Sequence, residues 1–283
     1  MKSNFMINLG CGPVFVDGPD WINLDFAAPT PSVRQANLLK RLPLPSAKAQ
    51  LVYSSHFLEH IPKPEVDGFL RECLRILQPG GILRLVLPDL EEMARSYLAW
   101  RDSGEHEKAN FLVLEMVDQC VRRESGGELG RLYQRLLREA ASSEHHAMIA
   151  FIRERMGEDL ASRSRLKVIS EGRASTILDL TWILRGARHR LQQAWVRLWL
   201  AGLPAAFRTQ NVSLAGIGER HHWLWDFHQL QQTLSAVGFI TVIRCSADSS
   251  SIKDFPFHPL DIDADGRPRK GLESMYVEAR KPD

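Results

Sequence analysis

The chain has 283 residues, 44% of them hydrophobic and 25% charged, which is typical of a globular protein rather than a disordered or fibrous one. Its formal net charge of +2 gives no overall basic excess, so nucleic acid is not expected as a partner. No apolar run reaches the roughly 20 residues that span a bilayer. The N-terminus is too short and polar for a signal peptide, and the four cysteines are far apart, so we expect a cytoplasmic protein.

The first 90 residues alternate between short apolar runs and turn-forming residues. Such runs are typical of strands buried on both faces of a parallel sheet. Strands are predicted at residues 5–9, 21–25, 51–55 and 82–88. Between the last two, apolar residues recur at helical spacing from Val66 to Leu77, and a Pro-Gly-Gly sequence ends the pattern. This order of strand, helix and strand predicts a βαβ crossover.

The character of the sequence changes after residue 90. Residues 91–218 have a helical pattern, are rich in arginine and show no clear strands. An amphipathic helix is then predicted at 225–238, followed by strands at 239–245 and 273–281 that should pair antiparallel at a sheet edge. We therefore expect an α/β core formed by residues 1–90 and 219–283, with a helical insertion at 91–218 that serves as a substrate-recognition lid.

The segment "INLGCG" is followed by a second short strand that ends in Asp25. Glycines after a first strand let a ligand approach the backbone, whose free amides favour an anionic group. A carboxylate at the end of the next strand can accept hydrogen bonds from ribose hydroxyls, as in nucleoside-binding sheets. Taken alone, Gly10 and Gly12 are equally consistent with a simple turn.

Four segments in this order resemble the class I S-adenosylmethionine-dependent methyltransferases, in the type 11 branch: "INLGCG", "WINLD", "LVYSSHFLEHI" and "LRECLRILQPGGILRLVLPD". A fifth, "HHWLWD" at 221–226, is similar to a segment of relatives encoded with surface-glycan and natural-product genes. The resemblance implies a Rossmann-like, doubly wound and mostly parallel sheet, with the helical insertion after its fifth strand. It covers residues 5–90 and 219–281.

The resemblance also implies S-adenosyl-L-methionine as cofactor and assigns residues to it. The methionine end would be lined by Asn8, Gly10, Cys11 and Gly12, and Asp25 would hold the ribose. Asn37 and Leu38 would face the adenine, and Ser54 and Ser55 would lie beside the sulfonium.

The chain departs from the family at several positions. Val14 replaces the third glycine of the loop, Asn37 replaces an aspartate, and Gln50 stands where an aspartate often precedes the fourth strand. Only twelve residues separate Gly12 from Asp25. We therefore expect the first crossover to be a loop or a single turn rather than a full helix.

Methyl transfer mainly requires alignment of donor and acceptor, and a hydroxyl acceptor also requires a base. His221 and His60 are the candidate bases, with Asp226 as the carboxylate that orients His221, while His56 and Trp223 are expected to contact the acceptor. The alternatives are that His60 braces its loop and that His221 and Asp226 form a structural hydrogen bond. The two histidines of "HFLEH" lack further nearby ligands, so no metal site is expected.

The insertion contains a stretch from Leu180 to Gly218 without any acidic residue. The favoured interpretation is an amphipathic helix that packs on the core, with Leu184, Leu191, Trp195 and Leu198 on one face. The alternative is a lid that contacts an anionic acceptor or a membrane surface through residues 180–208. This alternative would place the protein at the inner face of the membrane.

The favoured function is O-methylation of a saccharide or a small natural product. The alternatives are methylation of a lipid-like or aromatic acceptor, and a catalytically degenerate nucleoside-binding fold that serves as a scaffold subunit.

Overall fold

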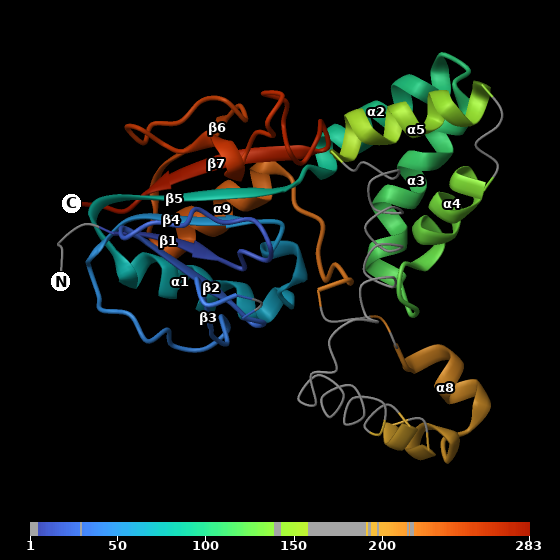
Figure 1. Cartoon of the computed structure of the whole chain (residues 1–283), viewed down its shortest axis with the longest axis horizontal. Coiled ribbons are helices and arrows are strands. Elements are labelled where there is room, and N and C mark those ends of the chain that lie inside the picture. The colour runs from blue at the N-terminus through green and yellow to red at the C-terminus, as the bar shows by residue number, and fades with distance from the viewer. Residues whose placement is uncertain are drawn as a thin grey trace, which may run out of the picture.

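The computed structural model describes residues 5–28, 30–138, 143–157, 191, 194–196, 198–213, 215 and 218–283. Seven strands form one sheet in the order β3-β2-β1-β4-β5-β7-β6, in which only β7 runs antiparallel to its neighbours (Figure 1). The strands are β1 (Phe5–Leu9), β2 (Trp21–Asp25), β3 (Val33–Gln35), β4 (Ala49–Ser55), β5 (Leu77–Pro88), β6 (Ile240–Cys245) and β7 (Ser274–Arg280).

This sheet confirms the predicted Rossmann-like fold. The predicted strands and the crossover helix α1 (Val66–Ile76) are present, and β6 pairs antiparallel with β7 at the sheet edge. β3 was not predicted. Within the described residues 10–20 no helix joins β1 to β2, which agrees with the expected short crossover. Because β2 and β4 lie on opposite sides of β1, the order in which strands are added to the sheet reverses there. Ligands of open α/β sheets bind at the carboxyl ends of the strands at such a switch point.

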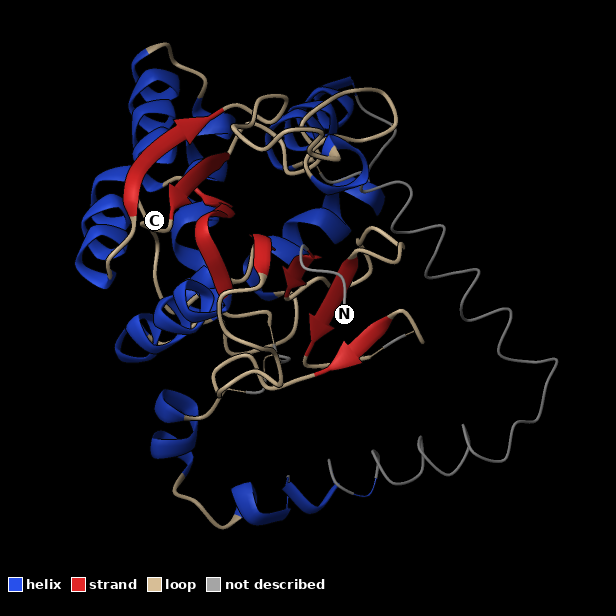
Figure 2. Cartoon of the chain, turned by 90° about the vertical axis from the view of Figure 1, so that its left-hand side faces the viewer, coloured by secondary structure: helices blue, strands red, loops and turns tan. Residues whose placement is uncertain are grey.

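The two faces of the sheet are covered differently. Helices α1 and α9 (Phe227–Val237) pack on one face around a core that includes Leu9, Leu70 and Leu230. The other face is covered mainly by the β6–β7 connection, which includes the short helix α10 (Phe257–Leu260), rather than by further long helices (Figure 2).

A buried ion-pair network joins that connection to the sheet. The guanidinium of Arg84 in β5 is fully buried and pairs with Asp261 at 2.8 Å and with Glu278 at 2.7 Å. The hydroxyl of Tyr53 donates to the same Asp261 at 2.7 Å. The network fixes the β6–β7 connection against the middle of the sheet.

The insertion begins directly after β5. Its helices α2 (Leu90–Asp102), α3 (His106–Val121), α4 (Gly127–Arg138) and α5 (Ser143–Met156) share a hydrophobic cluster that includes Phe111, Leu129 and Ile152. Arg155 of α5 is buried and pairs with Glu115 of α3 and Glu92 of α2. This cluster and ion pair give the four helices a core of their own beside the sheet (Figure 1).

The end of α5 crosses the loop that leads into β7 at very close range. The amides of Leu272 and Glu273 donate to the carbonyls of Glu154 and Arg155. A Cβ on Gly157 would lie 2.1 Å from a carbonyl oxygen of this loop, and a Cβ on Gly271 would lie 2.1 Å from the carbonyl oxygen of Arg155. Only glycine therefore fits at both positions of the crossing.

The later part of the insertion contains α8 (Ala205–Asn211), which lies apart from the sheet and from α2–α5 (Figure 1). Just before it, Trp195 and Trp199 are 61% and 69% exposed and contact each other edge to face. Leu191 and Leu198 are also exposed, so the expectation that this face packs on the core is wrong for these residues. Residues 180–190 lie outside the described residues. In the part of the chain that the structure describes, no helix combines the length and apolarity that a membrane crossing requires.

Candidate functional site

The glycine loop follows β1 at the switch point. Gly10 and Gly12 have φ values of +67° and +53°, which an L side chain rarely adopts. A Cβ on Gly10 would lie 2.8 Å from the ring of Phe57, whereas a Cβ on Gly12 would meet no atom within 4 Å. Gly10 is therefore required for packing, and the backbone of Gly12 is the part of the loop open to a ligand.

Asp25 lies at the carboxyl end of β2 and is half-buried. One carboxylate oxygen accepts a hydrogen bond from the Gly12 amide and the other from the Ala27 amide, both at 2.9 Å. Each oxygen keeps a further lone pair for another donor. The acid and the glycine loop are thus held together as one unit, with the carboxylate fixed in orientation.

Three of the predicted cofactor residues support this unit through buried side chains. Asn8 Nδ2 donates to the Val14 carbonyl at 3.3 Å, and Ser54 Oγ donates to the Leu9 carbonyl at 2.9 Å. Both side chains are almost fully buried, so they brace the loop rather than line open space. Burial also raises the pKa of the Cys11 thiol to about 12, so this thiol stays protonated.

The predicted adenine contacts lie beyond β3. Asn37 is exposed, and its side-chain oxygen accepts a hydrogen bond from the Leu39 amide at 3.0 Å. The Leu38 side chain is buried in the main hydrophobic core, so only its backbone could face a ligand. Ser55, at the end of β4, is half-buried.

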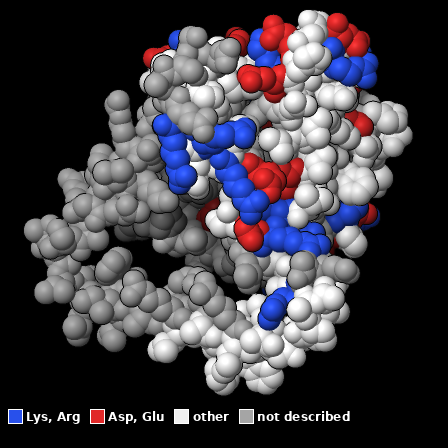
Figure 3. All heavy atoms as spheres, turned by 90° about the vertical axis from the view of Figure 1, so that its right-hand side faces the viewer, with Lys and Arg blue, Asp and Glu red and all other residues white. Residues whose placement is uncertain are grey.

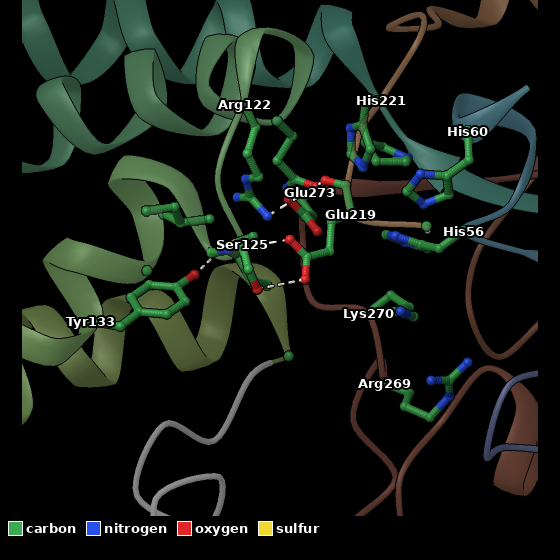
Figure 4. A pocket seen from close by; sticks show the side chains of 18 of the residues that line it. His56, His60, Arg122, Ser125, Tyr133, Glu219, His221, Arg269, Lys270 and Glu273 are labelled. Atoms are coloured by element: carbon green, nitrogen blue, oxygen red, sulfur yellow. Dashed lines mark hydrogen bonds between the residues drawn. The ribbon is translucent and has the colours of Figure 1, made fainter. Parts of the chain in front are cut away.

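A cavity of about 780 Å³ adjoins the glycine loop at Val14. The core contributes His56, His60 and His221 to its lining. The insertion contributes Arg122, Ser125 and Tyr133, and the loop before β7 contributes Arg269, Lys270 and Glu273 (Figure 4). The cavity therefore lies between the carboxyl ends of the strands and the α3–α4 part of the insertion, and the two parts of the chain form it together.

The histidines of the cavity surround one carboxylate. Glu59 lies in η1 (Leu58–His60), directly after β4. Its Oε1 is 3.4 Å from His56 Nδ1 and 3.9 Å from His60 Nε2. The rings of His60 and His221 meet edge to face with centroids 4.8 Å apart. The structure thus brings together the three histidines singled out from the sequence.

Glu59 was not predicted as a site residue. It is only 1% exposed, and burial raises the pKa of its carboxyl. Neither of its oxygens has a hydrogen-bond partner among the described residues. The sequence places Glu59 between His56 and His60 in the "HFLEH" segment, and this was the one sign that it could belong to the site. Its burial against His221 depends on the tertiary fold and could not be predicted.

The expected pairing of His221 with Asp226 is wrong. The Asp226 carboxylate caps α9, where it accepts hydrogen bonds from the Gln229 amide at 2.7 Å and from Gln229 Nε2 at 3.0 Å. His221 instead lies beside His60, and its backbone amide donates to the Gln119 carbonyl. Burial lowers the pKa of His221 to about 3, so its imidazole is neutral at physiological pH.

Trp223 is also placed differently from the expectation. It does not line the described wall of the cavity: its indole Nε1 donates to Gln229 Oε1, and the ring is 39% exposed. Trp225, two residues later, is fully buried in the main core, with the ammonium of Lys63 3.5 Å from its ring centroid. Both tryptophans of "HHWLWD" therefore serve the structure around α9.

The cavity carries charges of both signs. Arg122 is paired with Asp118 of α3 at 2.6 Å, and Ser125 donates to a carboxylate oxygen of Glu219 at 2.8 Å. The face of the molecule on the insertion side likewise shows Lys and Arg next to Asp and Glu (Figure 3). Such a lining can bind hydroxyl groups or an anionic group.

Comparisons with known proteins bear on this geometry. Residues 22–85 match the family described as a methyltransferase domain. No curated protein matches the chain.

Several solved structures are similar to the chain. An S-adenosylmethionine-dependent methyltransferase from Archaeoglobus fulgidus is 10% identical, with a TM-score of 0.38 over 99% of this chain and 87% of that one. A chain from the complex of the Haloferax volcanii Trm112 methyltransferase activator with a methyltransferase is 10% identical, with a TM-score of 0.38 over 99% and 84%. An S-adenosylmethionine-dependent methyltransferase from Mesorhizobium loti is 22% identical, with a TM-score of 0.24 over 30% of this chain and 47% of that one.

Proposed function

We propose that the chain is an S-adenosylmethionine-dependent methyltransferase that methylates a hydroxyl group of a saccharide or a small natural product. The observation that carries the proposal is the joined unit of glycine loop and acid, whose Gly12 amide donates to Asp25 at 2.9 Å beside a polar cavity of about 780 Å³. The unit suits a nucleoside-linked donor, and the cavity suits an acceptor rich in oxygen atoms.

In this proposal the residues at the strand ends hold the cofactor. Asp25 accepts hydrogen bonds from the ribose hydroxyls, and the Gly12 backbone lies against the methionine end, where no side chain intervenes. When bound, S-adenosylmethionine supplies a methyl group already activated by a positive sulfur. The contribution of the protein to the rate is then mainly the alignment of acceptor and donor across the cavity.

The cavity lining supports a polar acceptor over an aromatic or lipid-like one. Its basic side chains, which include Arg122 from the insertion and Lys270 from the loop before β7, can bind hydroxyl or phosphate oxygens. A fully apolar acceptor would shield these basic groups from water, at a cost in binding. The histidines lie at the strand end of the same cavity, where acceptor and donor would meet.

We further propose that residues 194–208 contact an anionic surface, either a membrane or a lipid-linked acceptor. The support is the exposed pair Trp195 and Trp199, together with five arginines and no acidic residue between Leu180 and Gly218. Tryptophans flanked by basic residues are typical of interfacial segments. This contact would keep the protein at the inner membrane face while it acts on a polar headgroup or sugar.

The test of the function combines binding and turnover in the full-length chain. Titration calorimetry should show binding of S-adenosylhomocysteine, and the labelled methyl group of S-adenosylmethionine should appear in an acceptor from a panel of saccharides, sugar phosphates, phenols and lipids. Asp25→Ala should abolish or strongly reduce both signals. If the chain binds the cofactor but labels only phenols or lipids, the result would support the alternative acceptors. If it binds no cofactor, the methyltransferase function is refuted and the scaffold subunit is the function that is left.

A further inference from the structure

Three side chains that are able to bind a metal converge at the strand end of the cavity. One nitrogen or oxygen atom from each of Glu59, His60 and His221 lies within 4.8 Å of the other two. Glu59 and His60 belong to η1 after β4, whereas His221 follows the insertion. Figure 4 shows the rings of His60 and His221 next to each other at the edge of the cavity. Two distant parts of the chain therefore build this cluster.

Two members of the cluster are buried and have side-chain polar atoms without a hydrogen-bond partner among the described residues. Glu59 is 1% exposed and His221 is 5% exposed. Among the described residues, neither carboxylate oxygen of Glu59 nor Nδ1 of His221 has a hydrogen-bond partner. Buried polar atoms are almost always paired, because an unpaired one costs about 1–3 kcal/mol. A cation bound between these atoms would satisfy them together.

The third member is already oriented as a ligand. His60 Nδ1 is 2.9 Å from the Arg220 carbonyl oxygen, which can only accept, so Nδ1 carries the hydrogen. The lone pair is therefore on Nε2, which lies 3.9 Å from Glu59 Oε1. Metal-binding histidines characteristically donate their other ring nitrogen to a carbonyl or a carboxylate in this way.

The backbone around the cluster is held by further hydrogen bonds. The Glu59 carbonyl accepts from the amides of His222 at 2.7 Å and Trp223 at 3.3 Å. These bonds fasten η1 to the segment that carries His221. His56 Nδ1 also lies 3.4 Å from Glu59 Oε1, and His56 Nε2 is 2.9 Å from Ser274 Oγ.

We propose that Glu59, His60 and His221 bind one divalent first-row transition-metal ion, whose open coordination positions face the cavity and take an oxygen atom of the methyl acceptor. Two imidazoles and one carboxylate suit ions such as Zn²⁺, Fe²⁺, Co²⁺ or Mn²⁺. Ligand atoms about 2.1 Å from an ion lie about 3.4 Å apart, so the side chains close in by a small rotation when the ion binds. Ion binding stands independently of the proposed function, and only the role of the acceptor oxygen rests on it.

The ion would also activate the acceptor. A bound divalent ion would lower the pKa of a coordinated hydroxyl, so the acceptor could release its proton to water without a strongly basic side chain. The resulting oxygen anion would form the bond to the methyl carbon as the carbon–sulfur bond of the donor breaks. His221 then acts as a neutral ligand, in keeping with its burial. The acceptor class that fits is one with two neighbouring oxygens, such as a vicinal diol or a hydroxy acid, because three protein ligands leave room for a bidentate group.

The first experiment measures the ion itself. The full chain is stripped with a chelator and titrated with Co²⁺, followed by visible absorption, and with Zn²⁺ in competition. We expect one ion per chain, with an affinity that falls at least about 100-fold in Glu59→Gln and in His221→Ala, beyond the usual effect of an outer contact. The matched control is His222→Ala, whose exposed side chain is outside the cluster and whose backbone bond to Glu59 remains. It should bind Co²⁺ within about twofold of the wild type.

Failure to bind Co²⁺ and Zn²⁺, or equal binding by Glu59→Gln and the wild type, would overturn the proposal. Melting curves of each variant show whether it is folded, and the isosteric Glu59→Gln change should preserve the fold. Acetohydroxamate, a bidentate oxygen ligand, should change the absorption spectrum of the Co²⁺-bound wild type. An unchanged spectrum would refute the proposal that the bound ion has open coordination positions facing the cavity. Binding of S-adenosylhomocysteine to the same metal-free sample tests the proposed function separately.

Discussion

Replacement of Asp25 by alanine tests the assignment of the cofactor site most directly. The carboxylate accepts two backbone hydrogen bonds of 2.9 Å, from Gly12 and Ala27, and the proposal adds two from the ribose. Hydrogen bonds to a charged group contribute about 1.5–3 kcal/mol net. Because Asp25 is half-exposed and water replaces part of each bond, we expect the total loss in binding to fall in that range. The Kd for S-adenosylhomocysteine should then rise about 10- to 150-fold.

The same change should also affect the loop. Loss of the acceptor for the Gly12 amide should lower the stability by about 1 kcal/mol, or about 2–4 °C in Tm. Asp25→Asn keeps one acceptor oxygen and should give an intermediate Kd. The control is Asp17→Ala, an exposed carboxylate in the same β1–β2 connection, which should leave both values unchanged. Calorimetry that finds Asp25→Ala within about twofold of the wild type would refute the ribose assignment.

Three other predictions concern the loop, the insertion core and the exposed tryptophans. Gly12→Ala should keep the fold, with a stability loss of about 1–2 kcal/mol for its left-handed backbone, and should weaken cofactor binding about tenfold. Gly10→Ala should lower Tm more, because its Cβ would lie 2.8 Å from the ring of Phe57. A lower Tm for Gly12→Ala than for Gly10→Ala would contradict this geometry. Arg155→Met should cost about 3–5 kcal/mol in urea unfolding, because it leaves a buried glutamate unpaired, and a loss below about 1 kcal/mol would show the pair to be dispensable. Combined Trp195→Ala and Trp199→Ala should reduce co-sedimentation with anionic vesicles at low salt without a change in Tm, and a wild type that never sediments would remove the surface contact.

Much of the fold could be predicted because its signals are local. The strands β1, β2, β4 and β5 are apolar runs bounded by turn residues. Helix α9 ends at Val237, and the next residue, Gly238, has a φ of +113° that only glycine adopts readily. β3 escaped prediction because it has three residues, of which only Val33 is buried. Its pairing with β2 is decided by the sheet rather than by its own sequence.

The candidate site was predicted less well, because its contacts are long-range. The sequence indicated the three histidines but not that Glu59 would be buried among them. Asp226 was assigned to His221 on the basis of proximity in sequence, although Asp226 and Gln229 match the spacing of a helix capping box, which was the better reading. A capping signal is local and could have been recognised; the burial of Glu59 against a residue 162 positions away could not.

The close crossing at Gly157 and Gly271 bears on how an acceptor enters the cavity. Besides this crossing, the Leu90 amide is bonded to the Trp225 carbonyl and the His221 amide to the Gln119 carbonyl, so α2–α5 are fastened to the core at three separate places. A unit held at three points has no single hinge about which it could swing. If the acceptor binds there as proposed, the α3–α4 side of the cavity would act as a fixed wall and select acceptors by fit to a preformed shape rather than by closing over them. Binding should then change the width of the cavity little, and affinity should depend on how well a rigid acceptor matches it.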